Sequence, residues 1–384
     1  MNYCYIDDKG LEQLKKNPKV TIDDSEKPIY KCTTEVTTIM FVLNNSKKPY
    51  TVVPPNEIPI TGTKAFRIFT DLIKKETGKD LKEICGSLAR RPETEQFIRR
   101  CVPTPVCWSI KSISKRQDIF EHCMKADIKS AFSYEGSKPL PNMNEYKVSY
   151  TERIEPTEEY PFCFYSDGTL SIYNELDSAD WERDGTFTVD YNERIFKRDL
   201  EYTKRKQKLF TTDIKTIACK AATESLKQVF EKLFEEKENG NKQAKSIMNF
   251  FVGYCWAKSK PIYAHIAAVI IARCNKRVID YAKQLIVEGN MPLLICTDSV
   301  AWVNTNPTNI DLKERGNNKL GDFAIEYKDC VICIKSCKAY QIHYCGTTYT
   351  TWSGIKKNQS CKMKFGDILH VEDVFEQYEI CKNW

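Results

Sequence analysis

The sequence predicts an α+β fold in which antiparallel strands and helices occupy different stretches of the chain. Short runs of alternating apolar residues precede residue 175, and helical periodicity dominates from about residue 212 to 289. A chain of 384 residues is too long for one ordinary core. We therefore expect two or three subdomains, and the sequence contains no internal repeat that would favour a solenoid.

The first 120 residues alternate between strand and helix signals. The runs "TTIMFVLNN" and "PYTVVPP" are rich in β-branched residues and predict short strands. "GTKAFRIFTDLIKKETG" has apolar residues at helical spacing and ends at Gly78, so it predicts a helix. The Pro-rich "CVPTPVCW" predicts a connector.

The middle of the chain predicts strands first and helices afterwards. "HCMKADIKSAFSY" predicts a strand that runs into a loop, and "FCFYSDGTLSIYNEL" predicts a hairpin with Asp167-Gly168 at its turn. From about Thr212 the period is helical, and "IACKAATESLKQVFEKLFEEKENG" predicts a helix that ends at Gly240. Further helices are predicted in "KQAKSIMNFFVGYCW" and from Pro261 to near Gly289.

Two strand signals follow these helices. "LLICTDSVAWV" predicts a buried strand whose middle is interrupted by a Thr-Asp-Ser triplet, and "DCVICIKSCKAYQIHY" predicts another strand. A carboxylate within a strand costs several kcal/mol unless something pairs with it. Asp298 therefore needs a partner.

Charge and cysteine usage indicate a cytosolic protein with basic clusters. The formal net charge is +6, and basic residues concentrate in "ARRPETEQFIRRC" through "KSISKRQD" and in "FKRDLEYTKRKQKLFTTDIK". Such runs are usually solvated helix faces, but they also suit a polyanionic partner. Seventeen cysteines at irregular spacing, without an apolar leader, predict reduced thiols. No apolar run approaches the roughly 20 residues of a membrane span, so we expect a soluble protein without a membrane partner.

The cysteines Cys330, Cys333 and Cys337 form a C-x2-C-x3-C pattern that invites a metal-site interpretation. On a strand, residues three apart point to opposite faces, and no second Cys/His pair has matching spacing. We therefore predict ordinary buried thiols. No G-x-x-x-x-G-K-[ST] or G-x-G-x-x-G motif occurs, which argues against a P-loop ATPase and a Rossmann dehydrogenase.

Two aspartates are the candidates for chemistry. Asp127 ends one apolar strand segment, Asp298 interrupts another, and a Ser follows each within a few residues. Two strand-borne carboxylates suit a divalent-cation site, because hard ions such as Mg²⁺ take oxygen ligands and share them with substrate phosphates. A single Asp near a Ser more often caps a turn, and spacing alone does not decide between the two interpretations.

Four motifs occur in order along the chain. They are "DIKSAF" at 127–132, "KSIMNFFVG" at 245–253, "CTDS" at 296–299 and "KAY" at 338–340. In order and rough spacing they resemble motif A (D-x-x-S-L-Y), motif B (K-x-x-x-N-x-x-Y-G), motif C (D-T-D-S) and the K-x-Y motif of family B DNA polymerases. The following "TTWSGIKK" is similar to a Lys/Gly-rich segment of the protein-primed branch, found in small phages and linear plasmids. The resemblance covers about residues 121–360.

The resemblance implies a role for each matching position. Asp127 and Asp298 would be the catalytic, metal-binding carboxylates, with the backbone carbonyl of Ile128 nearby. Asp298 would then be tolerated at a hairpin tip because metal cations pair with it. The implied nucleotide-binding residues, with Phe132 as the gate under the sugar, are Ser130, Ala131, Phe132, Lys242, Lys245 and Asn249. The implied primer and DNA contacts are Ser299, Lys338, Tyr340 and Lys356.

The implied fold is a right-hand polymerase with an antiparallel β palm, helical fingers and a short thumb, next to a small α+β N-terminal domain. The expected parts are an accessory module at 1–120, palm at 121–194, fingers at 195–255, palm at 256–355 and thumb at 356–384. The implied cofactor is Mg²⁺, as two ions, with Mn²⁺ as an alternative. The implied partners are primer-template DNA, dNTPs, and a protein primer or other replication protein, in a bacterial or viral-host cytosol.

The implied reaction is template-directed addition of nucleotides to a 3′-hydroxyl with release of pyrophosphate. Five positions depart from the family pattern: Cys296 replaces the first Asp of motif C, Val252 replaces an aromatic residue near the templated base, Phe132 replaces Tyr, and Ala131 and Ser133 replace Leu and Pro. These departures keep two alternatives open. One is a polymerase-like nucleic-acid-binding protein with reduced or no catalysis, and the other is an untemplated terminal nucleotidyltransferase.

The sequence also predicts synthesis without proofreading. Editing in the resembled family lies in an N-terminal domain that opens with Asp-x-Glu on a strand. The aspartates of "YIDDKG" and "TIDDSE" are adjacent, so on a strand their carboxylates would point to opposite faces. Glu93 and Glu95 are two apart but lie among arginines in a helix-like stretch.

Overall fold

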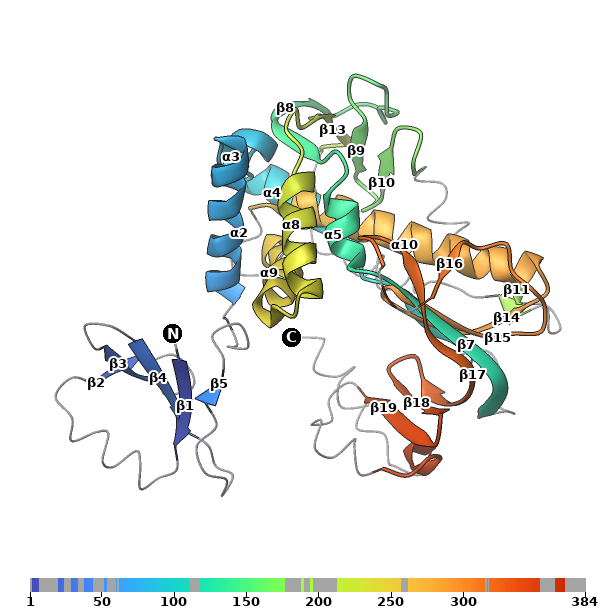
Figure 1. Cartoon of the computed structure of the whole chain (residues 1–384). Helices are drawn as coiled ribbons and strands as arrows, with labels where there is room; N and C mark the ends of the chain where they lie inside the picture. Colours follow the sequence, from blue (N-terminus) through green and yellow to red (C-terminus); the bar gives the residue numbers. More distant parts are fainter. Residues whose placement is uncertain are drawn as a thin grey trace. The chain divides into compact units, whose positions relative to one another are not determined.

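The computed structural model describes residues 60, 62–110, 118–176, 213–256, 262–314, 316, 318–352 and 363–369, and the backbone of further strands within 2–53 and 188–195. The chain forms two compact units, whose elements are labelled in Figure 1. The first comprises Met1–Leu72 and Glu231–Phe251, and the second comprises Ile73–Phe230 and Val252–Trp384.

The first unit contains a five-stranded sheet in the order β2-β3-β4-β1-β5. Its strands are β1 (Asn2–Ile6), β2 (Val20–Asp23), β3 (Ile29–Thr33), β4 (Thr38–Leu43) and β5 (Val52–Val53). Strands β4 and β5 lie in the two runs predicted as strands. Helix α2 (Gly62–Thr77) confirms the predicted helix, and Gly78 ends it with φ 75°. Within this unit Phe69 stacks on Phe251, with ring centroids 4.0 Å apart.

The second unit is built on an eight-stranded sheet in the order β19-β18-β17-β7-β15-β14-β6, with β16 paired to β17. The strands are β6 (Cys107–Ser109), β7 (Ile119–Ile128), β14 (Met291–Cys296), β15 (Ser299–Val303), β16 (Leu312–Lys313), β17 (Phe323–Ser336), β18 (Ala339–Tyr344) and β19 (Thr347–Trp352). Every pair except β16–β17 is antiparallel. The two halves of "LLICTDSVAWV" are thus adjacent strands.

Two expectations for this sheet were incomplete. The connector "CVPTPVCW" ends in strand β6, which pairs with β14, so the sheet begins before residue 121. The single strand predicted in "DCVICIKSCKAYQIHY" is two antiparallel strands, β17 and β18, that turn at Cys337-Lys338. The residues before and after this turn are similarly apolar, so the hydrophobic pattern does not mark where the chain reverses direction.

A four-stranded sheet has the order β10-β9-β13-β8, with β8 (Pro141–Ser149), β9 (Phe162–Tyr165), β10 (Leu170–Ile172) and β13 (Thr216–Ala221). The β9–β10 hairpin turns at Asp167-Gly168 as predicted, and Gly168 has φ 84°. The prediction of helical structure from Thr212 onward was wrong for Thr216–Ala221, which form strand β13. This strand lies between β8 and β9 and is buried from Thr216 to Cys219, so strand pairing overrides its local helical pattern.

The helix of that region begins after β13, as α8 (Lys227–Glu238). Its predicted apolar face is buried and consists of Leu226, Val229, Phe230 and Leu233. Helix α9 (Lys242–Cys255) confirms the second predicted helix. The remaining described elements are α3 (Leu81–Cys85), α4 (Pro92–Arg100), α5 (Ala131–Gly136), the 3₁₀ helix η3 (Asp367–Leu369) and the ribbon of β11 (Thr188–Val189) and β12 (Arg194–Ile195).

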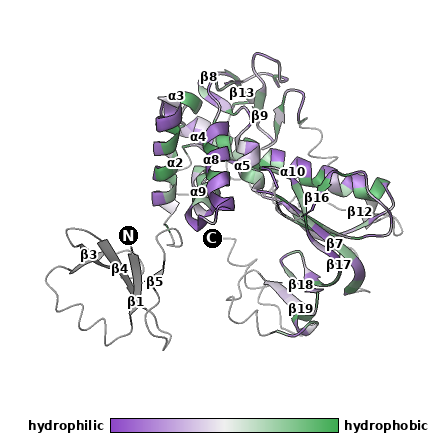
Figure 2. Cartoon of the chain, in the orientation of Figure 1, coloured by the Kyte–Doolittle hydropathy of each residue, from purple (hydrophilic) through white to green (hydrophobic). Residues whose placement is uncertain are grey.

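Helix α10 (Ala264–Val287) supports the eight-stranded sheet and confirms the third predicted helix. It contacts β14, β15, α4 and α5, and Figure 1 shows it running along the sheet. Figure 2 shows hydrophobic and hydrophilic residues alternating along it. Residues Ala264–Asn275 are all buried, and only the second half of the helix has an exposed side. Val278, Ala282 and Leu285 share a core cluster with Leu294 and Trp302 of the sheet.

Polar side chains of α10 connect it to loops around the sheet. Asn275 accepts a hydrogen bond from the Val106 amide and donates one to the Thr104 carbonyl, both 2.9 Å long. Arg277 donates to the Gly321 carbonyl at 2.6 Å. Because Asn275 is buried, these bonds replace its lost contacts with water and fix the segment before β6.

Several sequence predictions fall on residues outside the described part. These are Lys356 with the rest of "TTWSGIKK" beyond Trp352, the basic stretches at 111–117 and 196–212, and the thumb at 356–384 apart from 363–369. All cysteines of the described part are free thiols; Cys330 and Cys333 are buried as predicted, and Cys337 is half-buried. None of the described helices is long and apolar enough to cross a bilayer.

Gly321 provides a test of how tightly α5 packs. It has φ 87°, and a Cβ atom there would overlap with the ring of Tyr134 on α5. Gly321→Ala should therefore lower the free energy of unfolding by about 2–4 kcal/mol through backbone strain and overpacking. Gly346→Ala is the matched control, because Gly346 also has positive φ but nothing lies within 4 Å of its Cβ position. Equal losses in a denaturant titration would contradict the packing of Gly321 against Tyr134.

Candidate active site

Asp298 lies at the tip of the β14–β15 hairpin. Cys296 pairs with Ser299, so Thr297 and Asp298 form the whole turn. Thr297 has φ 61°, a value that is strained for a β-branched residue and costs on the order of 1–3 kcal/mol. The Asp298 amide donates to the Cys296 carbonyl at 2.7 Å, which closes the turn tightly.

Three neighbouring elements hold this turn in place. The Thr297 amide donates to the Val106 carbonyl at 2.8 Å, and the Ile128 amide donates to the Asp298 carbonyl at 2.8 Å. From α10, the Cys274 thiol donates to the Thr297 carbonyl at 3.7 Å. The strained turn is therefore determined by the sheet and by α10 together.

The sheet brings Asp127 next to this tip. Asp127 is on β7, between Ser299 of β15 and Ala324 of β17 in the strand register. Asp298, in the turn, directly precedes Ser299, the residue that pairs with Asp127, so the two aspartates lie next to each other. The predicted pair of catalytic carboxylates does meet in one place.

The two carboxylates influence each other electrostatically. Burial, and then the charge of Asp127, raise the pKa of Asp298 to about 6 from an ordinary value of 3.8. The nearby Lys125 ammonium opposes this rise. A half-buried carboxylate beside a second one is stabilised by nearby cations, which here include the ammonium groups of Lys125 and Lys129.

Lysines and a glutamate that the motifs did not identify surround the aspartates. Lys129 forms an ion pair with Asp127 at 2.7 Å. Lys125 is buried and forms an ion pair with Glu326 of β17. Burial opposes the charged form of Lys125, but Tyr340, Glu326 and Asp127 outweigh it and raise its pKa. The sequence did contain a signal for Lys125: it is two residues from Asp127 on one strand, and residues at that spacing point to the same face of a sheet.

The turn after β7 contains the predicted nucleotide-binding residues of motif A. Ser130 has φ 49° and its carbonyl accepts from the amides of Ser133 and Tyr134, which starts α5 directly after the strand. Ala131 is buried, and Phe132 is half-buried and packs against the core cluster of the sheet. The predicted loop is therefore a tight turn into a short helix.

The predicted primer-binding residues are near the carboxylates where they are described. Ser299 is buried, and its hydroxyl donates to the Cys296 carbonyl at 3.3 Å. Tyr340 on β18 is buried, interacts electrostatically with Lys125, and has a pKa raised mainly by burial. Lys338 occupies the β17–β18 turn and interacts electrostatically with Cys107 of β6.

The predicted phosphate contacts of motif B are on α9. Lys242, Lys245 and Asn249 are all exposed and, at helical spacing, share one face. They belong to the first compact unit, whereas the two aspartates belong to the second. Their action on the same nucleotide therefore stays a prediction. Val252, where the family pattern has an aromatic residue, is buried.

Cys296, which replaces a motif C aspartate, is opposite Cys107 in the β14–β6 register. A hydrogen bond with the Cys296 thiol lowers the pKa of Cys107 to about 6, aided by Lys338 and Thr297 and opposed by burial. The same hydrogen bond, with burial, raises the pKa of Cys296. The place of the missing carboxylate is thus taken by a thiol pair.

The two aspartates could bind Mg²⁺ if a substrate supplied further oxygen ligands. No cluster of three or more His, Cys, Asp or Glu side chains able to hold a metal occurs among the described residues. Mg²⁺ often uses only one or two protein carboxylates and completes its shell with waters and phosphates. Asp127 and Asp298 would supply these two carboxylates, and the Ile128 carbonyl directly follows Asp127 in the chain.

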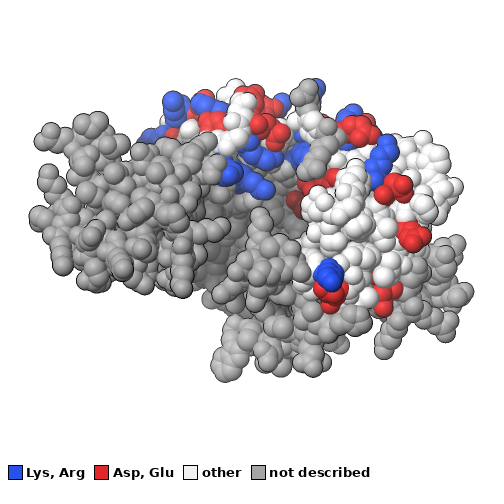
Figure 3. All heavy atoms as spheres, turned by 60° about the horizontal axis from the view of Figure 1, so that its bottom comes forward, with Lys and Arg blue, Asp and Glu red and all other residues white. Residues whose placement is uncertain are grey.

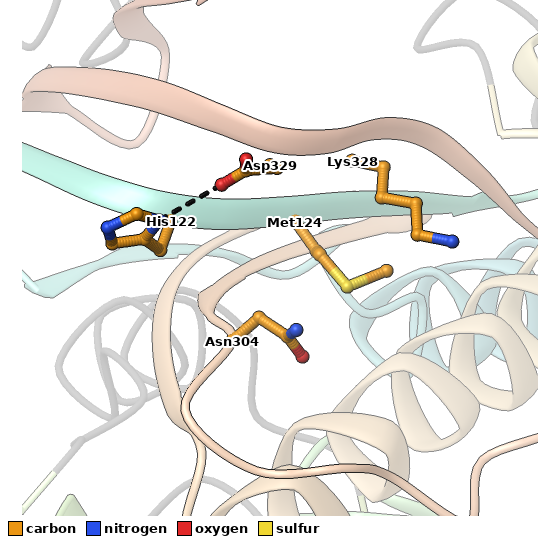
Figure 4. A pocket seen from close by; sticks show the side chains of 5 residues that line it. All are labelled: His122, Met124, Asn304, Lys328 and Asp329. Atoms are coloured by element: carbon orange, nitrogen blue, oxygen red, sulfur yellow. Dashed lines mark hydrogen bonds and ion pairs between the residues drawn. The ribbon is translucent and has the colours of Figure 1, made fainter.

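A pocket of about 240 Å³ lies elsewhere on the second unit, and none of the predicted site residues lines it. Figure 4 shows His122 and Asp329 pointing toward each other there, with Nδ1 and Oδ1 3.0 Å apart, while Lys328 points away. On the face shown in Figure 3, basic and acidic side chains are interspersed over the described residues.

Comparison with known proteins finds similar structures but no similar sequences. No protein-family model matches the chain, and no curated protein sequence matches it. The fold is similar to that of phi29 DNA polymerase complexed with primer-template DNA (TM-score 0.56, 13% identity, 88% of this chain and 78% of that chain) and to its ternary complex with incoming nucleotides (0.56, 14%, with the same coverage).

The orthorhombic crystal form of phi29 DNA polymerase also matches, with a TM-score of 0.54 and 14% identity. That match covers 80% of this chain but only 62% of the phi29 chain. At these identities the likeness concerns the fold, and it agrees with the predicted mixture of helices and antiparallel sheet. The chain has a polymerase-like fold.

Proposed function

We propose that this protein is a template-directed DNA polymerase that adds dNTPs to a 3′-hydroxyl. One observation carries the proposal: Asp127 on β7 and Asp298 in the adjacent β14–β15 turn, far apart in sequence, meet at one place in a polymerase-like fold. In this proposal the eight-stranded sheet is the palm, and the helical segment with α9 belongs to the fingers.

The two aspartates would hold two Mg²⁺ ions, which supply an activated attacking oxygen and stabilise the leaving pyrophosphate when bound. The protein itself contributes the fixed separation of the carboxylates, because the turn at Thr297 is anchored to β6, β7 and α10. The Lys125–Glu326 pair adjusts the charge beside them. Such preorganised charge is effective since it needs no rearrangement during the reaction.

The remaining residues would bind substrates. Phe132 would pack under the sugar, with Ser130 and Ala131 beside the triphosphate. Lys242, Lys245 and Asn249 would contact the nucleotide from the exposed face of α9. Ser299, Lys338, Tyr340 and Lys356 would hold the primer strand or DNA.

A polymerase-like protein that binds nucleic acid without turnover is the second candidate. One observation favours it. The position of the first motif C aspartate holds Cys296, whose thiol is hydrogen bonded to Cys107, so this position offers a metal no carboxylate. A primer-extension assay with Mg²⁺ and dNTPs, with and without template, separates the candidates. Template-dependent extension supports the polymerase, whereas DNA binding without extension supports the second candidate.

Loss of either carboxylate should remove catalysis but not binding. Asp127→Asn or Asp298→Asn should lower the incorporation rate at least about a hundredfold, because the lost charge acts on the transition state. DNA affinity, measured by fluorescence anisotropy, should change little and should fall with salt. Asp280→Asn, an exposed carboxylate on α10, is the control and should retain activity. Near-normal incorporation by Asp298→Asn would contradict the site.

The carboxylate pair should also destabilise the metal-free fold. The pKa of Asp298 is about 6 in the folded protein and 3.8 ordinarily. The folded state therefore binds the Asp298 proton more tightly than the unfolded state, and this stabilises the fold most below about pH 4. The stabilisation is lost as the pH rises through 6. At pH 8 in EDTA, Asp298→Asn should raise the free energy of unfolding by roughly 1–3 kcal/mol. Mg²⁺ should raise the Tm of the wild type more than that of the variant.

The control for this stability change is Asp329→Asn. Asp329 is an exposed carboxylate of the same sheet, and Asn accepts its positive φ of 54°. Its unfolding free energy should stay within about 0.5 kcal/mol of the wild type. An Asp298→Asn protein that is less stable than the wild type in EDTA would show that the two carboxylates do not repel each other.

Phe132 should discriminate between deoxyribonucleotides and ribonucleotides. If its ring packs under the sugar, Phe132→Ala should increase ribonucleotide use relative to deoxyribonucleotide use, since a 2′-hydroxyl would no longer be excluded. The measurement is the ratio of the two kcat/KM values, which is insensitive to the folded fraction. Tyr134→Ala, which removes a ring from the same helix, should leave that ratio unchanged. An unchanged ratio in Phe132→Ala would assign its ring to the core.

Synthesis should lack 3′→5′ proofreading. Glu93 and Glu95 are in the first turn of α4 rather than on a strand, so they do not form the kind of editing site that the resembled family has on a strand. A 5′-labelled mismatched primer-template, incubated with Mg²⁺ and no nucleotides, should therefore stay intact. Metal-dependent shortening that persists in Asp127→Asn would reveal a separate nuclease site.

A further inference from the structure

Cys107 and Cys296 have the geometry of a cross-strand disulfide. They are opposite each other in the β6–β14 register, and the Thr297 amide donates to the Val106 carbonyl at 2.8 Å. That bond flanks the pair, which identifies it as a non-hydrogen-bonded pair of the antiparallel ladder. At such pairs the Cα atoms are about 4.5 Å apart, within the range of about 4.4–6.8 Å that a disulfide spans.

The exposure of the two thiols distinguishes them from another cysteine pair in the sheet. Cys107 and Cys296 are both half-buried, so small solutes can reach them. Cys123 and Cys330 are also opposite each other, in the β7–β17 register, but both are buried. Burial raises the pKa of Cys330 to about 11, and a buried protonated thiol reacts slowly. The sheet therefore contains one accessible cross-strand pair of thiols and one buried pair for comparison.

We propose that Cys107 and Cys296 form a reversible disulfide in response to hydrogen peroxide, and that this bond controls the hairpin that carries Asp298. The Cys107 sulfur attacks one peroxide oxygen, the O–O bond breaks, and one water is released as Cys107 becomes a sulfenic acid. The Cys296 sulfur then attacks Cys107, loses its proton, and releases the second water. Two thiols lose two electrons in total, and one peroxide is reduced to two waters.

Closure of this bond acts directly on the carboxylate tip. A disulfide requires an S–S separation near 2.0 Å, shorter than the separation of two hydrogen-bonded thiols, so the Cys296 side chain moves toward β6. The Cys296 carbonyl accepts hydrogen bonds from the Asp298 amide and the Ser299 hydroxyl. The strained turn passes the movement to Asp298. This consequence for catalysis rests on the proposed polymerase function, whereas the disulfide itself does not.

The disulfide is tested by peptide mapping of the full chain. Reduced protein is treated with hydrogen peroxide near neutral pH, and its remaining thiols are alkylated before digestion and mass spectrometry without reductant. The Cys107–Cys296 link should form at least tenfold faster than the Cys123–Cys330 link and should disappear with dithiothreitol. Cys345→Ser, which removes an exposed lone thiol, should leave the link unchanged. Alkylation of both Cys107 and Cys296 after complete peroxide treatment would overturn the proposal, as would equal rates for the two links.

Control over the site is tested separately. Oxidised wild type with the mapped link should incorporate nucleotides at least tenfold more slowly, and dithiothreitol should restore the rate. Cys107→Ser, treated in the same way, should keep its rate within twofold. Undiminished incorporation by linked protein would overturn the control of Asp298. Absence of incorporation even in the reduced wild type would instead contradict the proposed function, and the mapped link would still stand.

Discussion

Two half-buried carboxylates, Asp127 on β7 and Asp298 in the β14–β15 turn, lie next to each other, and the repulsion between them is the constraint on this part of the second unit. Asp298 has a raised pKa because it is buried beside Asp127. Its turn is strained at Thr297, yet hydrogen bonds to β6, β7 and α10 hold it. The stability of the surrounding sheet thus offsets a local arrangement that is unfavourable without a cation. The proposed metal ions would relieve this repulsion.

Helix α10 makes that arrangement rigid. Its apolar side forms one core with β14 and β15, and Asn275 fixes the segment that leads into β6. Through β6 the same support reaches Cys107, which is opposite Cys296. The carboxylates and the thiol pair are therefore not independent features. The proposed disulfide at Cys296 and the proposed metal at Asp298 would both act on the two-residue turn between Cys296 and Ser299.

The sequence correctly predicted those helix ends and hairpin turns that depend on the residues at the turn itself. Gly78 ends α2 because the chain turns there with positive φ, and Asp167-Gly168 forms the β9–β10 turn for the same reason. The interruption at Thr297-Asp298 correctly indicated polar residues that leave the strand pattern. The error at Thr216–Ala221 has a non-local cause: small buried residues suit either a helix or a central strand, and only pairing with β8 and β9 decides between them.

The sequence by itself determined the residue types and their order: two aspartates after apolar runs, lysine and asparagine at helical spacing on α9, and a lysine and tyrosine near the end of the sheet. Tertiary structure alone decided which of them meet. The approach of Asp127 to Asp298, the Lys125–Glu326 pair and the Cys107–Cys296 pair all depend on the register between strands distant in sequence. A shift of one residue in that register would turn each side chain to the opposite face of the sheet, and no local pattern encodes that choice.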